Sequence, residues 1–156
     1  FRSLWQVLCG IDLVETFEVT LPVGDPLLTL LTDRRVPQVQ SVKDGLWVRL
    51  MDVPAALSAR TYALDTDLTV AVKDPFLHAG GVFRMVVRDG HAEVVRTDRE
   101  PDVTLSSSVL GSLYLGAHRA RQFAAANRVQ ATSERALHEF DLTFGTPRQP
   151  EIGWFF

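Results

Sequence analysis

Three aromatic side chains stand at the carboxyl end of this 156-residue chain, in the sequence Gly153-Trp154-Phe155-Phe156. Chain ends are usually polar and mobile, so side chains with this much apolar area are unusual there. Two interpretations compete: the segment packs over its own domain, or it inserts into a cleft and carries the terminal α-carboxylate with it. A carboxylate among aromatic rings loses hydration, which raises its pKa and makes it a better proton acceptor. The second interpretation makes the Phe156 carboxylate a candidate general base.

The other reactive residue types give no second candidate. Cys9 adjoins Leu8 on a predicted helix and is interpreted as a small buried apolar residue. The histidines lack the i, i+3 or i, i+4 spacing that pairs metal ligands on a helix, so we expect surface or structural residues and no metal. The sequence also lacks a G-x-S-x-G elbow, a calcium-loop spacing and a phosphate-loop pattern. The four histidines are His78, His91, His118 and His138.

The composition is that of an ordinary globular chain, with 46% hydrophobic and 22% charged residues, which excludes intrinsic disorder. Sixteen Lys and Arg against nineteen Asp and Glu give a net charge of −3, so no positive field points to nucleic acid or to an anionic membrane. No apolar run approaches the roughly 20 residues of a membrane helix. The chain opens at Phe1 inside an apolar helical pattern and without a signal peptide. We therefore expect a carboxyl-terminal piece of a longer protein.

The first part of the chain is predicted to mix short helices with strands. Asp25-Pro26 and Asp52-Val53-Pro54 each place a capping Asp before a Pro, which is typical of a helix start. Asp44-Gly45 is a turn dipeptide and predicts a hairpin. The predicted elements are a helix over 1–10, a strand over 14–23, a helix over 26–31, a strand over 46–51 and a helix over 52–62.

The second part is predicted to form strands first and helices last. Asp89-Gly90 predicts a second hairpin, and Ser107 or Ser108 is expected to cap a helix. This segregated order predicts an α+β fold, with a mainly antiparallel sheet and helices packed on it. The predicted strands cover 68–72, 82–88, 91–96 and 103–106, and the predicted helices cover 107–114, 120–127 and 133–144. The aromatic residues expected in the core are Trp47, Phe76, Phe83, Phe123, Phe140 and Phe144.

Several blocks of this sequence resemble one known family. The more specific are Leu110-Gly111-Ser112-Leu113-Tyr114-Leu115-Gly116-Ala117-His118-Arg119 with Ala124–Arg128 after it, and Asp44–Leu50 followed by Val53–Tyr62. Together they are similar to the carboxyl-terminal part of the enhanced intracellular survival (Eis) family of GNAT N-acetyltransferases. Shorter matches at Leu4-Trp5 and at Asp25-Pro26-Leu27 extend the resemblance over nearly the whole chain.

The resemblance implies a domain organisation. Members of the family have an amino-terminal GNAT acetyltransferase domain, a second GNAT-like domain without cofactor, and a domain resembling sterol carrier protein. Residues 1–42 would then be the end of the second GNAT-like domain, and residues 43–156 the sterol-carrier-like domain. The acetyl-CoA site and the general-acid tyrosine of the family lie in the amino-terminal domain. No cofactor-binding residue is therefore expected in this chain, and Tyr114 is not that acid.

The resemblance also implies an activity. The family transfers an acetyl group from acetyl-CoA to amines, on aminoglycoside antibiotics, which confers resistance, and on lysine side chains. Its general base is the carboxylate of the last residue, here Phe156, and the resemblance places Asp44 and Phe155 in the acceptor pocket. Some members have Glu where this chain has Phe155, so one acidic group is missing. The implied partners are the amine acceptor, the rest of its own chain and further copies in a hexamer. The implied location is cytoplasmic, with export in some members.

Alternatives remain open at this point. Asp44 has a purely structural explanation as part of the predicted hairpin turn with Gly45. The whole domain has two other interpretations, a sterol-carrier-like module that binds an apolar ligand, or a non-catalytic oligomerisation domain. An apolar ligand would need a large apolar cavity, whereas the aromatic residues named above would instead fill an ordinary core.

Overall fold

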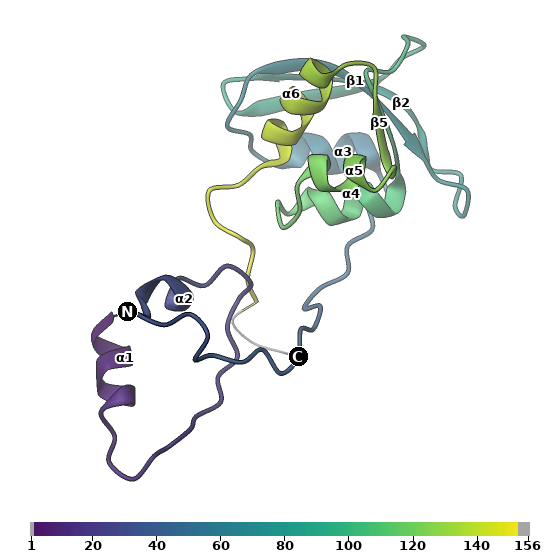
Figure 1. Ribbon diagram of the computed structural model, residues 1–156. Coiled ribbons are helices and arrows are strands. Elements are labelled where there is room, and N and C mark those ends of the chain that lie inside the picture. The colour runs from purple at the N-terminus through teal and green to yellow at the C-terminus, as the bar shows by residue number, and fades with distance from the viewer. Residues whose placement is uncertain (1, 153–156) are drawn as a thin grey trace. The chain divides into compact units, whose positions relative to one another are not determined.

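The computed structural model describes residues 2–152 (Figure 1). The chain divides into two compact units, the first ending at Lys43 and the second beginning at Asp44. We call them unit 1 and unit 2.

The described residues of unit 1 form two helices, α1 (Arg2–Cys9) and α2 (Leu27–Leu30). The Asp25 carboxylate accepts a hydrogen bond from the Leu27 backbone N–H at 2.8 Å. The helix starts one residue later than predicted, because Pro26 is its N-cap and Leu27 its first residue. The strand predicted over 14–23 is wrong, since the described residues of unit 1 form no strand. Its alternating pattern has no partner strand to pair with, and alternation alone does not stabilise an isolated strand. Cys9 is exposed, contrary to the sequence interpretation, because α1 buries only Trp5.

Unit 2 is built on a five-stranded sheet in the order β3-β2-β1-β4-β5. The hairpin at Asp89-Gly90 is confirmed, and both residues have positive φ, +49° and +81°, as a two-residue hairpin turn requires. The α+β fold with a mostly antiparallel sheet is also confirmed, although β1 and β4 pair in parallel. Strand β5 was not predicted, because three residues are too short to show a period. The strands are β1 (Thr66–Lys73), β2 (Gly81–Arg88), β3 (His91–Arg96), β4 (Val103–Ser106) and β5 (Val129–Ala131).

The described part of unit 2 also contains four helices: α3 (Val53–Ala59), α4 (Ser107–Tyr114), α5 (Ala120–Ala125) and α6 (Glu134–Phe144). Asp52 caps α3 by accepting a hydrogen bond from the Ala55 N–H. Ser133 caps α6 by the same type of bond to Ala136. The cap of α4 is Ser106, which accepts from Val109, and neither Ser107 nor Ser108. The capping residue of α4 therefore lies one position before the first predicted one, three residues ahead of the N–H that it binds.

The core lies on one face of the sheet, where helices α3 to α6 cover it (Figure 1). The strand register brings Val70 level with both Phe83 and Val103, so alternate residues of three strands share that face. Phe83, Phe140 and Phe144 are almost completely buried, as predicted. Trp47 and Phe76 are 85% and 78% exposed, so the prediction that they belong to the core is wrong. Among residues 2–152, no helix is long and apolar enough to cross a membrane.

The segment that opens unit 2, residues 44–51, lies against α4 and forms no strand. We call it the arm. The predicted strand over 46–51 and the hairpin at Asp44-Gly45 are therefore wrong. A β-carbon on Gly111 would overlap the Val48 carbonyl oxygen, which shows how closely the arm backbone approaches the middle of α4. Packing against a helix has replaced strand pairing here.

We predict that Gly111→Ala destabilises the chain. Alanine is favoured over glycine inside a helix by about 1 kcal/mol, but here its methyl group would push against a backbone carbonyl, and such overpacking costs about 1–3 kcal/mol. The expected result is a lower urea midpoint and a displaced arm. The matched control is Ser112→Ala on the next position of α4, which we expect to change stability by less than about 0.5 kcal/mol. A urea midpoint for Gly111→Ala above that of the unchanged chain would show that the arm moves aside at no cost in stability.

Candidate functional site

The arm is fastened by an ion pair to Asp74, the residue that follows β1. The Arg49 guanidinium donates a hydrogen bond of 2.6 Å to Asp74, whose side chain is only 3% exposed. Asp74 also accepts from the backbone N–H groups of Phe76 and Leu77, and the Arg49 guanidinium lies 5.5 Å from the centre of the Phe76 ring. Burial alone would raise the pKa of Asp74, but Arg49 and the two N–H groups outweigh it and hold the pKa below its ordinary value. Asp74 therefore stays ionised and keeps the arm in place.

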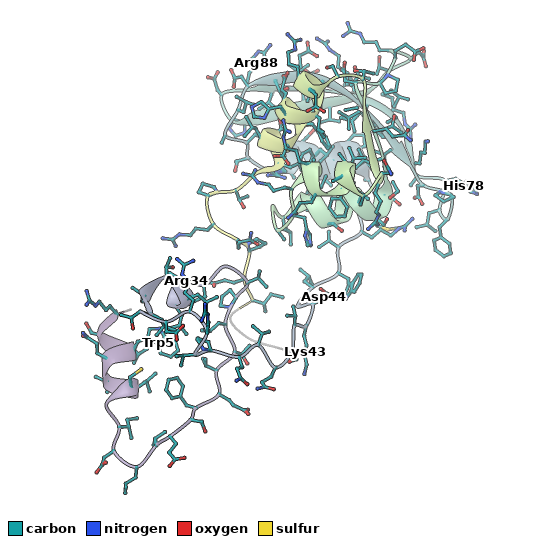
Figure 2. The ribbon with its side chains drawn as sticks, in the orientation of Figure 1. Trp5, Arg34, Lys43, Asp44, His78 and Arg88 are labelled. Carbon is teal, nitrogen blue, oxygen red and sulfur yellow. The ribbon has the colours of Figure 1, made fainter. Side chains whose placement is uncertain are left out.

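Asp44 lies at the far end of this arm from the buried Leu50 (Figure 2). Its side chain is exposed, and within residues 2–152 its carboxylate makes no hydrogen bond and no ion pair. Because the structure has no hairpin at Asp44-Gly45, the turn explanation for Asp44 no longer applies. What remains is an exposed carboxylate on an anchored segment, with no partner among residues 2–152.

The carboxyl-terminal segment returns to the same place. We call residues 145–152, which follow α6, the tail. The Ile152 Cδ1 atom lies 3.3 Å from the position that a β-carbon on Gly45 would take. The last described residue of the chain is thus in contact range of the neighbour of Asp44. Phe155 and Phe156, the other two predicted site residues, lie outside the described residues.

Two tyrosines close to the arm are structural. The Tyr62 hydroxyl donates a hydrogen bond of 2.6 Å to the Leu57 carbonyl, and the Tyr114 hydroxyl donates one of 2.9 Å to the Ala56 carbonyl. Burial raises the pKa of Tyr62 well above its ordinary value, so the hydroxyl remains protonated at neutral pH. Arg60 ties the same region together, donating to the Tyr114 carbonyl at 2.8 Å while stacking on Tyr62. These groups fasten α3 to α4.

The remaining candidates take no part in the site. All four histidines are exposed, as predicted, and His78 lies on the loop between β1 and β2 (Figure 2). Residues 2–152 contain no cluster of His, Cys, Asp and Glu that could hold a metal ion. A cavity of about 240 Å³ in unit 2 is lined mainly by polar side chains, including Lys73, Ser106 and Arg128, and so gives no support to an apolar ligand.

Sequence reasoning did not identify the anchors of the site. Arg49 and Asp74 are 25 positions apart, and neither lies in a pattern that signals pairing. From the sequence, Gly111 and Gly116 were only members of the block 110–119 and had no structural role assigned. The structure shows that each glycine faces another segment of unit 2, Gly111 the arm and Gly116 the tail.

Comparison with known protein families divides the chain in a similar place. Residues 53–153 match the sterol carrier protein domain, and residues 1–50 match an acetyltransferase (GNAT) domain. The second match ends inside the arm, seven residues beyond the boundary between the two units.

Individual relatives agree with these matches. The chain is 40% identical over 144 residues to N-acetyltransferase Eis of Mycobacterium tuberculosis (strain ATCC 25177 / H37Ra), covering 92% of this chain and 35% of that protein. It is 37% identical over 150 residues to an uncharacterized N-acetyltransferase of Streptomyces griseus, covering 96% of this chain and 36% of that protein. The crystal structure of Eis1 from Mycobacterium abscessus superposes with a TM-score of 0.83 at 38% identity, over 99% of this chain and 39% of that one.

These comparisons confirm the resemblance stated from the sequence. The chain spans only about a third of the length of the curated relatives it matches. Its residues 53–153 form a sterol carrier protein domain, preceded by a fragment of a GNAT domain. The chain therefore belongs to the sterol carrier protein domain family, in the form that this domain takes in Eis-family GNAT N-acetyltransferases.

Proposed function

We propose that this chain is part of an acetyl-CoA-dependent N-acetyltransferase, in which it supplies the general base and part of the acceptor pocket. The base is the terminal carboxylate of Phe156, and Asp44 and Phe155 line the pocket. The observation that carries the proposal is the approach of Ile152 to Gly45. It brings Ile152, the last described residue, close to the neighbour of Asp44, whose carboxylate makes no hydrogen bond or ion pair within residues 2–152.

The reach of the remaining chain is consistent with this arrangement. Four residues follow Ile152, and an extended chain spans at most about 3.5 Å per residue, so the terminal carboxylate lies within roughly 14 Å of Ile152. The tail begins at the end of α6, and Pro147 and Pro150 restrict its backbone. A short, restricted tail is suited to holding a base in one region, whereas a long flexible one would spread it over a large volume.

The chemistry follows from these groups. The acceptor nitrogen attacks the thioester carbonyl of acetyl-CoA, the carbon–sulfur bond breaks, and CoA leaves as a thiolate that must take up a proton. The attacking amine must lose a proton, which the Phe156 carboxylate accepts. A base has to lie within about 3 Å of that proton, directly or through one water. Acetyl-CoA is assigned to a part of the protein outside this chain, together with the general acid.

The acceptor is expected to be a cationic amine. Asp44 would attract an ammonium group and hold it near the base, which suits polycationic aminoglycosides and lysine side chains alike. Phe155 in place of an acidic residue lowers the negative charge of the pocket, so we expect weaker aminoglycoside binding than in family members with Glu there. Assembly into a hexamer belongs to the same proposal.

The first test of the proposal alters the chain end in the intact enzyme. Adding one Gly after Phe156 converts its carboxylate into a neutral amide and moves the charge by up to about 3.5 Å. We expect turnover with an amine acceptor to fall by roughly 10²-fold, the scale of a lost general base. Deleting Phe156 should have a similar effect.

The extension removes no side chain, so its thermal unfolding should match that of the unaltered enzyme, which serves as the folding control. Near-normal turnover of the extended enzyme would mean that the carboxylate is not the base and that the tail only packs.

The second test concerns Asp44. We predict that Asp44→Asn raises KM for a cationic amine about fivefold, since a charge pair near 4 Å in water is worth about 1 kcal/mol, and leaves kcat nearly unchanged. The increase should shrink at high salt, which screens the pair. The matched control is Asp98→Asn, which removes the same charge from an exposed position between β3 and β4. Equal KM values for the two variants would show that Asp44 is not part of the acceptor pocket.

A further inference from the structure

The direction of the tail is set where it leaves α6, and the groups that set it lie outside the proposed pocket. Gly116, which follows α4, has a φ of +82°, a conformation that L side chains rarely adopt. A β-carbon at Gly116 would lie 2.5 Å from the Thr146 hydroxyl oxygen and would also overlap its methyl group. Thr146, the second residue of the tail, therefore packs directly onto the glycine turn.

The Thr146 hydroxyl shapes the tail from within. It donates a hydrogen bond of 2.7 Å to the Arg148 carbonyl, two residues further on, and lies 3.4 Å from the Gly116 carbonyl oxygen. The chain bends at residues 147–148, where Pro147 fixes one φ angle. One hydroxyl thus closes the bend and contacts the turn that supports it.

A second contact supports the same start of the tail. The Arg119 guanidinium occupies the space beside Gly145 and lies 3.4 Å from the Asp141 carbonyl oxygen of α6. Both supporting residues, Gly116 and Arg119, come from the connection between α4 and α5. This connection therefore fixes the point from which the tail departs.

We propose that Thr146 is a positioning residue for the terminal base, and that its contacts with Gly116 and Arg148 aim the tail at Asp44. The inference rests on the function proposed above. The tail is short, so the angle at which it leaves residue 146 decides where its last residue arrives. A hydroxyl that fixes this angle restricts the base to the acceptor region without touching substrate.

The experiment compares three variants of the intact enzyme. Thr146→Val keeps the size and branching of the side chain but removes the hydroxyl, and Thr146→Ser retains the hydroxyl. The matched control is Thr132→Val, at the other end of α6, where the hydroxyl lies 3.4 Å from the Asp102 carbonyl oxygen. Neither threonine is in the core, so folding is expected to survive all three changes.

The first measurement is independent of catalysis. Trypsin cleaves after arginine, and the exposed Arg148 lies inside the bend. We expect Thr146→Val to speed cleavage of the Arg148–Gln149 bond by about fivefold, the factor that one hydrogen bond typically contributes. Thr146→Ser and Thr132→Val should cleave at the rate of the unaltered enzyme.

The second measurement is turnover. Thr146→Val should lower kcat by roughly tenfold or more, because small misplacements of a catalytic group are costly. The KM for acetyl-CoA should stay unchanged. Thr146→Ser should have the kcat of the unaltered enzyme. Faster cleavage with unchanged kcat would overturn the positioning role, as would unchanged cleavage. If the Gly extension of Phe156 leaves turnover normal while Thr146→Val speeds cleavage, the Thr146 hydroxyl holds the bend but the Phe156 carboxylate is not the base. Failure of the proposed function can thus be told apart from failure of the Thr146 proposal.

Discussion

The arrangement of unit 2 depends on how closely two backbone segments approach the α4–α5 region. Gly111 lets the Val48 carbonyl press against the middle of α4, and Gly116 lets Thr146 pack on the turn that follows. No residue with a side chain fits either position without movement of a neighbour. Because the two glycines are five positions apart on one rigid stretch, the arm and the tail share a common support. Gly111 lies inside α4 and Gly116 in the turn that follows it, so one helix and its turn set the separation of the arm and the tail.

This constraint explains the sequence block over 110–119 without assigning it any chemistry. Tyr114 fastens α3 to α4 through the Ala56 carbonyl, and Arg60 returns the contact through the Tyr114 carbonyl. The histidine of the block, His118, is exposed and coordinates nothing in the described chain. A block that identifies a family can therefore act as a scaffold, here for the arm and the tail.

What the sequence could predict was local. The Asp89-Gly90 turn, the cap at Asp52 and the helices over the last third all follow from residues within a few positions of one another. The strand prediction for the arm failed because its apolar residues suggested a strand, whereas the arm packs against α4 at Gly111, a residue far away in the sequence. The Arg49–Asp74 pair was equally inaccessible, since an ion pair between distant residues has no spacing rule. Asp44 and Phe156 were joined by family resemblance alone. The structure brings Ile152 close to Gly45, whereas Phe156 lies outside the described residues.

The contact between Gly45 and Ile152 has a further consequence for the order of assembly. It joins the two extremes of unit 2, so closing it requires bringing together residues with nearly the greatest separation that the domain allows. Contacts of this kind carry a high loop-closure entropy and tend to form late. On the ribosome, the β1–β2–β3 meander can pair long before the tail has been synthesised. A nascent chain would then have three paired strands before its arm has met the tail, and the approach of Ile152 to Gly45 would form only after the tail emerges.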